Sequence, residues 1–162
     1  EATYKTKGAK FIRLDRKLSK NFNRSITLKE VFRGYRFLKK GNFKKVCIVS
    51  HGTIIKRAID ASEKINKKFH KNISIIDLIR CKPFPLHLIS ELKKYDVIVS
   101  IDEQTFSGGL YSIISENLKN KKIINFSIPD KFIFENLGRE KLLDKNGLSV
   151  TSIFNKLKKI CK

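Results

Sequence analysis

Val46-Cys-Ile-Val-Ser-His-Gly-Thr53 is the stretch of this sequence that decides the fold. Its first four residues form an unbroken apolar run, which is typical of a strand buried on both faces. The Ser-His-Gly that follows predicts a turn into a helix over 53–69. Apolar side chains such as Ile55, Ala58 and Ile65 recur on one face of that helix, while lysines and acids occupy the other. The stretch therefore predicts a strand–turn–helix unit.

The same unit recurs toward the C-terminus. Short apolar runs at 73–78, 97–101 and 123–126 predict three more strands, with amphipathic helices between them. Two short helices are expected at the end, over about 140–144 and 149–159. Strands that alternate with helices build an open, mostly parallel sheet covered on both faces. We therefore predict an α/β fold with three layers, α/β/α.

The chain is strongly basic: 36 Lys and Arg oppose 15 Asp and Glu, a formal net charge of +21. Such a charge attracts polyanions, including nucleic acid, anionic membranes and phosphorylated substrates. Residues 1–42 hold +10 of it, and elsewhere the lysines are scattered, mostly as pairs. No RNP-like motif or Cys/His finger accompanies them, and no apolar run approaches the ~20 residues of a membrane helix. We expect a solvated basic surface, with neither nucleic acid nor membrane as partner.

Cysteine usage points away from secreted and zinc-binding folds. Cys47, Cys81 and Cys161 are odd in number and form no CxxC pair, which excludes a disulfide-stapled fold and a cysteine-rich zinc module. Cys47 and Cys81 lie in or beside apolar strands and are expected to be inert. None of the three histidines lies three or four residues from another, so no metal site is predicted. With no signal peptide, we expect a cytoplasmic protein, and the absence of Met suggests a trimmed product.

Polar residues follow two of the predicted strands, where parallel sheets place ligands. His51 follows the first strand, and Asp102-Glu103 follow the third. Carboxylates there can act as a base, but no Ser, Cys or Lys partner has suitable spacing. We therefore favour a structural or rim role for His51 and a hydrogen-bonding or interface role for Asp102-Glu103. No catalytic residue is predicted. Gly108-Gly109 opens a helix whose amides can hold an anion, although a tight turn with close packing is favoured.

Two arginines stand in Phe11-Ile-Arg-Leu-Asp-Arg16, which predicts a short strand over 11–14. The planar guanidinium of Arg13 or Arg16 suits bidentate capture of a phosphate. A plain surface role fits the residues equally well, so both interpretations stay open at this point.

Five stretches of the chain are each weak signals alone but form a specific pattern through their order and spacing: 11–16, 46–53, 76–84, 101–110 and 128–148. Over nearly the whole chain they resemble the C-terminal part of the transketolase family of thiamine-diphosphate enzymes. The first resembles the strand that closes the family's pyrimidine-binding domain. The fourth, with its acidic pair and Gly-Gly-Leu helix start, and the others resemble the C-terminal domain.

This resemblance implies a division of the chain into three parts. Residues 1–16 are expected to end a pyrimidine-binding domain, 17–42 to form a basic linker, and 43–162 to form the transketolase C-terminal domain. The family's Gly-Asp-Gly…Asn metal–diphosphate motif and its activating glutamate have no counterpart here. The resemblance implies that the complete enzyme uses thiamine diphosphate and Mg²⁺. Because the two motifs are missing here, this chain alone is expected to bind no cofactor and to be inactive.

The resemblance also implies a function and a set of site residues. The complete enzyme would transfer a two-carbon ketol unit between sugar phosphates, as a homodimer whose remaining domains lie on the same or a separate chain. Arg16, and less securely Arg13, would bind the substrate phosphate. The expected residues of the interface or active-site rim are His51, Glu103, Gly108 and Gly109.

Three departures from the family pattern affect the choice of activity. Gln104 stands where a histidine is frequent, Pro85 replaces an acid, and Arg80 is shifted one place from the arginine of deoxyxylulose-phosphate synthases. The shifted Arg80 makes deoxyxylulose-phosphate synthase less favoured than transketolase-type transfer. The beta subunit of a 2-oxo acid dehydrogenase is disfavoured because the Pro-Asp-Lys-Phe and Gly-Leu ending fits transketolase better. A free-standing regulatory or interaction domain of the same fold is the non-enzyme alternative.

Overall fold

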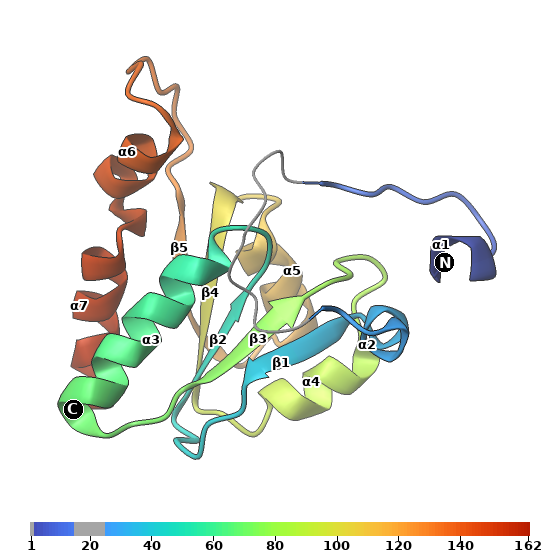
Figure 1. Cartoon of the computed structure of the whole chain (residues 1–162), viewed down its shortest axis with the longest axis horizontal. Coiled ribbons are helices and arrows are strands. Elements are labelled where there is room, and N and C mark those ends of the chain that lie inside the picture. The colour runs from blue at the N-terminus through green and yellow to red at the C-terminus, as the bar shows by residue number, and fades with distance from the viewer. Residues whose placement is uncertain (1, 15–24) are drawn as a thin grey trace.

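The computed structural model describes residues 2–14 and 25–162 and contains a five-stranded sheet (Figure 1). Its strand order is β1-β3-β2-β4-β5, with β1 antiparallel to β3 and all other pairs parallel. The predicted α/β fold with a mostly parallel sheet is confirmed. The strands are β1 (Tyr35–Lys39), β2 (Val46–Ser50), β3 (Ser74–Leu78), β4 (Val97–Thr105) and β5 (Lys122–Ile128).

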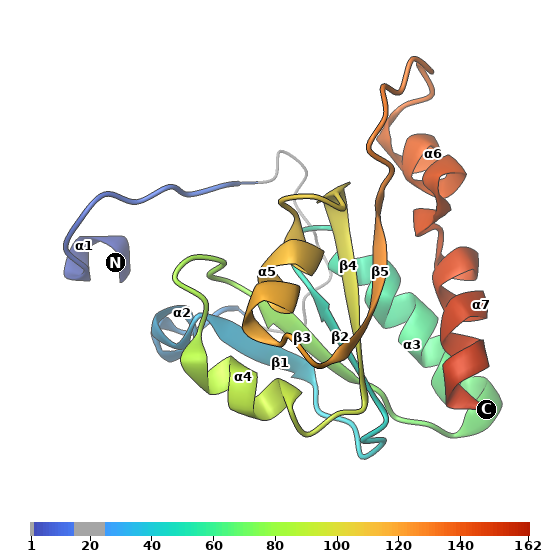
Figure 2. The same ribbon diagram turned by 180° about the vertical axis from the view of Figure 1, so that it is seen from behind.

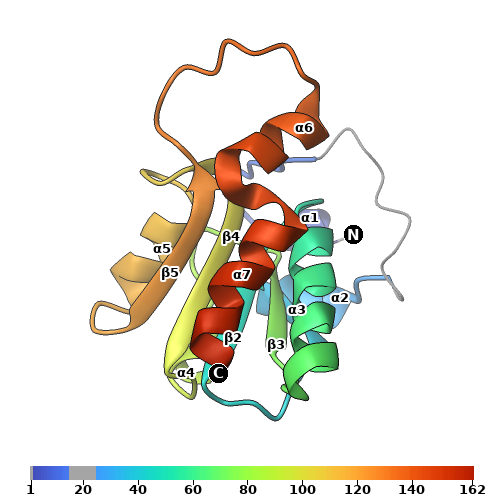
Figure 3. The ribbon, with the colours of Figure 1, turned by 90° about the vertical axis from the view of Figure 1, so that its left-hand side faces the viewer.

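Helices cover both faces of the sheet, as Figures 2 and 3 show. Helices α3 (Ile55–Phe69) and α7 (Val150–Cys161) pack side by side on one face. Helices α4 (Leu86–Leu92) and α5 (Leu110–Asn117) lie on the opposite face. Among the described residues, no helix is both long and apolar enough to cross a membrane.

The apolar run of β2 is continuous because both of its faces are covered. Val46 and Ile48 belong to the core beneath α3 and α7, whereas Cys47 and Val49 belong to the core beneath α4 and α5. All four side chains have no exposed surface. Burial of such aliphatic side chains stabilises the fold by about 1.5–3 kcal/mol each.

The chain between β5 and α7 folds over one end of the sheet. An extended loop over 129–138 leads into α6 (Arg139–Leu143) and a π-helical turn, η1 (Asp144–Leu148). Gly147 has a φ of 80° within this turn. That left-handed conformation suits glycine and agrees with the helix stop that the sequence predicts there.

The N-terminal region contributes two short helices, α1 (Ala2–Lys5) and α2 (Leu28–Arg33). Helix α2 begins with a capping box, in which Thr27 and Glu30 each bind the other's backbone N–H. It ends at Gly34, whose φ is 85°. The chain then enters β1 directly.

Two features of this region differ from the sequence-based expectation. Residues 11–14 form no strand in the described part of the chain, so that prediction was wrong. Strand β1 lies within the segment 17–42 that was expected to be a linker, yet it pairs with β3 along its length. Its apolar pattern is weak because Arg36 is buried in it. The division into three parts stays a prediction, but the sheet begins at Tyr35.

The strand order places a reversal of direction between β2 and β4. The chain leaves β2 through α3 toward β3, and it leaves β4 through α5 toward β5 on the other side. Open α/β sheets bind ligands outside the strand ends at such a reversal. We call the end of the sheet where β2, β3, β4 and β5 finish the carboxyl edge, and the opposite end the amino edge.

Candidate functional site at the carboxyl edge

His51 and Asp102 meet at the point where the strand order reverses. His51 follows β2 directly, and Asp102 lies near the end of β4. The His51 Nε2 atom lies 3.1 Å from Asp102 Oδ1. The His51 side chain is 19% exposed and that of Asp102 only 3%. The structure thus brings together two residues that the sequence analysis had treated separately.

The second oxygen of Asp102 has a structural partner. Asp102 Oδ2 accepts a hydrogen bond of 2.9 Å from the backbone N–H of Leu110, the first residue of α5. A carboxylate at a helix N-terminus stabilises the helix through its dipole and its unpaired amides. Asp102 therefore occupies the position that an external anion would need.

Electrostatics at Asp102 follow from this geometry. Burial raises the pKa of its carboxyl, whereas the neighbouring His51 ring and backbone N–H groups of Leu110 and Gln104 lower it. The lowering contributions together exceed that of burial, so the pKa lies below its ordinary value. Asp102 is thus held ionised, as a fixed negative charge beside His51.

The paired glycines shape the turn between β4 and α5. A Cβ atom at Gly109 would lie 2.4 Å from the carbonyl oxygen of Thr105, so only glycine fits this close approach. Gly108 has a φ of 74°, which also favours glycine. Because Asp102 already accepts from Leu110, the geometry supports a tight, closely packed turn more than an anion site.

Glu103 connects β4 to the C-terminal segment. The Arg139 guanidinium donates to both carboxylate oxygens of Glu103, and its Nη2 lies 2.5 Å from Thr53 Oγ1. Glu103 is thus held in a bidentate pair that joins β4 to α6. The interface or rim role expected of Glu103 from the sequence stays a prediction.

A second arginine fastens the same segment to α3. Arg57 Nη2 lies 2.7 Å from Glu140 Oε2, and its Nη1 lies 2.6 Å from Asp144 Oδ1 and 2.8 Å from the carbonyl oxygen of Leu148. The Arg57 side chain is 13% exposed, whereas both acids are more than half exposed. Arg57 and Arg139 together hold α6 and η1 over the carboxyl edge. Sequence reasoning missed both arginines because their partners are distant in the sequence: the acids that Arg57 binds lie more than 80 residues away, and Glu103 lies 36 residues from Arg139.

A buried ion pair joins β1 to β3 near the carboxyl edge. Arg36 of β1 faces Asp77 of β3, with Nε 2.9 Å from Oδ2. Burial raises the pKa of the Asp77 carboxyl above its ordinary value, and Arg36 opposes that shift. The pair was missed from sequence; the available signal was a charged residue within an otherwise apolar strand.

The remaining predicted residues have unlike surroundings. Arg13 is exposed, and Arg16 lies outside the described residues. Cys47 is fully buried, and burial raises the pKa of its thiol, as expected of an inert core cysteine. Burial also raises the pKa of the partly exposed Cys81. His70 is the residue at which α3 ends, and its backbone N–H binds the carbonyl oxygen of Asn66.

The residues that the structure describes do not fit thiamine diphosphate and its metal ion. No group of three His, Cys, Asp or Glu side chains that could hold a metal occurs among them. The carboxylates at the carboxyl edge already bind other groups: Asp102 contacts His51, Glu103 pairs with Arg139, and Asp77 pairs with Arg36. No reaction step through the cofactor is therefore derived for this chain.

Comparison with known proteins assigns the domain. The family model described as "Transketolase, C-terminal domain" matches residues 36–153. The chain belongs to this family. The matched region begins within β1 and thus contains nearly the whole sheet, together with helices α3, α4 and α5 and the start of α7.

Curated relatives of this transketolase C-terminal domain are named 1-deoxy-D-xylulose-5-phosphate synthase. The protein from Dictyoglomus thermophilum is 34% identical over 119 residues, which cover 70% of this chain and 19% of the relative. The protein from Vibrio parahaemolyticus is 31% identical over 135 residues, covering 80% and 20%. The chain therefore spans about a fifth of the length of the relatives it matches.

Solved structures agree on the fold. A split-gene transketolase, described as an inactive beta4 tetramer, superposes with a TM-score of 0.69 at 23% identity, covering 80% of this chain and 42% of that one. A transketolase variant from Pichia stipitis superposes with a TM-score of 0.62 at 15% identity, covering 84% and 19%. At these identities the likeness concerns the fold alone.

Proposed function

We propose that this chain is the C-terminal domain of a thiamine-diphosphate enzyme that transfers a two-carbon unit to a sugar phosphate. The observation that carries the proposal is the family match over 36–153, in a chain that spans a fifth of its enzyme relatives. The cofactor and Mg²⁺ would be held by the remaining domains, on the same or a separate chain. The homodimer and the cytoplasmic location belong to the same proposal.

The carboxyl edge has the surface properties of a face that docks onto other domains. Phe106, Phe132 and Phe134 are 51%, 87% and 89% exposed, and all three lie in connections at this edge. Exposed aromatic side chains gathered on one side of a domain are typical of an interaction surface. His51, Glu103, Gly108 and Gly109 would then lie at the rim of the interface.

A second candidate activity, 1-deoxy-D-xylulose-5-phosphate synthesis, is favoured by the named relatives at 31–34% identity. The shifted Arg80, which counted against it, has a local role. Its side chain donates to the carbonyl oxygens of Pro83 and Phe32, at 3.1 and 3.2 Å. It thereby ties the turn after β3 to α2, so its position says little about the substrate.

One assay separates the two activities. The complete protein, with thiamine diphosphate and Mg²⁺, is tested for ketol transfer from xylulose 5-phosphate and, in parallel, for formation of 1-deoxy-D-xylulose 5-phosphate. Formation of either product supports the general proposal and chooses between its two forms. Absence of both in a folded, cofactor-loaded protein would refute the enzyme proposal and favour a regulatory or interaction domain.

The proposed phosphate ligand has its own test. Because Arg16 matches the family's phosphate-binding arginine, Arg16→Ala in the complete enzyme should raise KM for phosphorylated substrates at least tenfold, and unphosphorylated ketols should be little affected. Lys17→Ala, one residue along the same basic segment, is the matched control. Equal effects on both substrate types, or equal effects of both variants, would remove Arg16 from this role. Arg13→Ala examines the second arginine in the same way.

A further inference from the structure

The fold gathers more than half of the chain's net positive charge on one side. The connections that enter β2, β3, β4 and β5 all lie at the amino edge, because a parallel sheet returns the chain to the same end each time. The C-terminus of α7 lies there too (Figure 1). The lysine pairs that are scattered along the sequence lie in these connections or at the ends of the helices and strands that they join. They are therefore neighbours in space.

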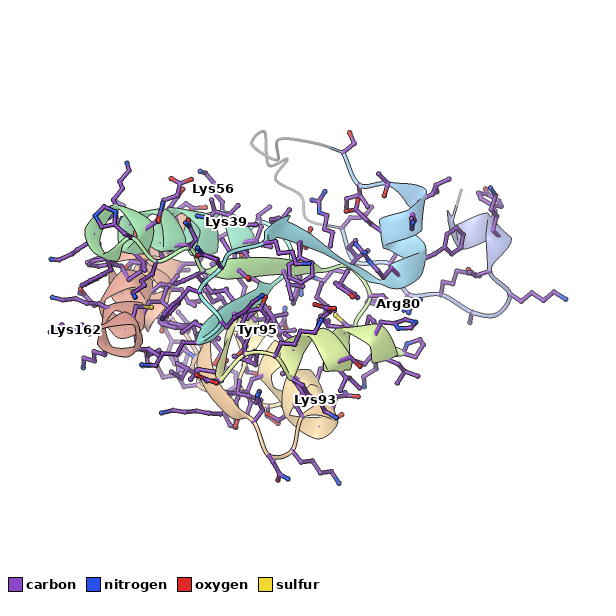
Figure 4. All side chains as sticks on the ribbon, turned by 90° about the horizontal axis from the view of Figure 1, so that it is seen from below. Lys39, Lys56, Arg80, Lys93, Tyr95 and Lys162 are labelled. Carbon is purple, nitrogen blue, oxygen red and sulfur yellow. The ribbon has the colours of Figure 1, made fainter. Side chains whose placement is uncertain are left out.

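The charge imbalance between the two edges is large. The amino-edge segments 39–45, 67–71, 91–96, 116–122 and 158–162 hold fifteen lysines against three acids, a formal +12 of the chain's +21. The carboxyl-edge segments 50–57, 77–87, 102–110 and 128–149 hold eight basic and seven acidic residues, a formal +1. Figure 4 looks onto the amino edge, with Lys39 at the end of β1, Lys93 just after α4 and Lys162 just after α7. We call this group of fifteen lysines the amino-edge lysine surface.

The ammonium groups of this surface are available to an external anion. Of the fifteen lysines, Lys94 alone has an ion pair within the described structure, with Glu91 at 2.7 Å. Several others lie over aromatic rings, such as Lys44 over Tyr95 and Lys71 over Phe43. Eleven of them are exposed. Like charges held this close repel one another, and a bound polyanion relieves that repulsion.

We propose that the amino-edge lysine surface binds the phosphodiester backbone of nucleic acid without reading its sequence. Five strands about 4.8 Å apart give the surface a width of roughly 19 Å, a length of duplex that carries about eleven phosphates. Lysines are flexible point charges that suit such contacts, and the surface contains no arginine for bidentate readout of a base. This inference does not depend on the proposed enzyme function.

Other polyanionic partners fit this surface less well. Interfaces between proteins are depleted in lysine and need apolar anchors. Stable attachment to a membrane needs a second, hydrophobic signal. None of the exposed large hydrophobic side chains found in the described residues falls within the five amino-edge segments. The one feature that the surface offers is positive charge, which suits a partner of high and regular negative charge density.

The test compares two variants of the complete protein with equal net charge. One neutralises four exposed amino-edge lysines, and the other neutralises four exposed lysines elsewhere. The amino-edge variant carries Lys45→Gln, Lys67→Gln, Lys93→Gln and Lys122→Gln. The control variant carries Lys29→Gln, Lys82→Gln, Lys131→Gln and Lys141→Gln. Circular dichroism and urea unfolding establish that both are folded.

Binding to a labelled 20-base-pair duplex is followed by fluorescence anisotropy between 25 and 200 mM NaCl. We expect the amino-edge variant to lose at least tenfold in affinity at 50 mM NaCl and its plot of log K against log salt to flatten by about 3, since each phosphate contact contributes a slope of about −0.9. The control should change less than threefold. Equal losses in both variants, no binding by the parent protein, or tighter binding to phosphatidylserine vesicles or polyglutamate than to DNA would overturn the proposal.

Discussion

Replacement of Arg36 by methionine tests whether the buried pair with Asp77 is required as a pair. The two side chains are 3% and 11% exposed, so solvent screens their interaction little. Removal of one partner leaves an uncompensated buried charge, which costs about 3–5 kcal/mol at neutral pH. For a domain of this size the loss corresponds to a fall in Tm of roughly 6–20 °C. The free energy of unfolding is measured by urea titration and the Tm by calorimetry.

The pH dependence gives the sharper result. Burial already raises the pKa of Asp77 above its unfolded value, and loss of Arg36 raises it further. A carboxyl whose pKa is higher in the folded state binds a proton more readily in that state. Its ionised form therefore destabilises the fold, and this effect is complete above the folded pKa. The effect disappears as pH falls toward the unfolded pKa near 4. The deficit of Arg36→Met should therefore be largest at pH 7 and shrink toward pH 4.

Two further variants serve as controls for this prediction. Asp77→Asn takes the Asp77 carboxylate away from Arg36, and because this variant has no carboxyl at position 77 to be protonated, its deficit should not shrink between pH 7 and pH 4. The double variant Arg36→Met/Asp77→Asn removes both charges and should recover most of the loss. The reasoning would be refuted if the loss of unfolding free energy in Arg36→Met did not depend on pH. It would also be refuted if the double variant were as unstable as Arg36→Met.

Two smaller predictions concern the turn between β4 and α5. Asp102→Asn keeps an acceptor for the Leu110 N–H but removes the charge, so we expect a loss of about 1 kcal/mol at pH 7 in urea unfolding. Because the pKa of Asp102 lies below its unfolded value, this contribution is present above about pH 4 and is lost on acidification. The unfolding free energies of parent and variant should therefore converge near pH 3. A difference between them that stays constant with pH would contradict this prediction. Gly109→Ala should cost at least 2 kcal/mol because its Cβ meets the Thr105 carbonyl, whereas Gly108→Ala, with open space but a positive φ, should cost about 1 kcal/mol; the reverse order would show that packing does not decide this turn.

The sequence predicted the parallel core of the fold well because burial on both faces leaves a strong local signal. Val46-Cys-Ile-Val49 is apolar without interruption, and each of its residues is fully buried. Strand β1 lies in the segment that the sequence analysis assigned to the linker. It lies at the edge of the sheet, and Arg36 interrupts its pattern. Its place in the sheet depends on Asp77, 41 residues later, which no local pattern reveals.

The candidate site was predictable residue by residue but not as an arrangement. The position of His51 and Asp102 at strand ends followed from the sequence, whereas their approach to 3.1 Å requires β2 and β4 to be neighbours. The strand order that makes them neighbours is not set by any one segment. The same holds for Arg139, which reaches Glu103 only once α6 has folded over the carboxyl edge.

Topology also changes the meaning of the charge. Along the sequence the lysine pairs look evenly spread, and that spacing favoured a solvated surface with no particular partner. In an alternating α/β chain, however, residues that enter successive parallel strands share one edge, so a pair repeated once per unit becomes a single dense surface. The exposed aromatic side chains Phe106, Phe132 and Phe134 lie at the opposite edge. The two edges of the sheet therefore differ in character: the carboxyl edge, with its exposed aromatic side chains, is suited to packing against another domain, and the amino edge, with its lysines, is suited to binding anions.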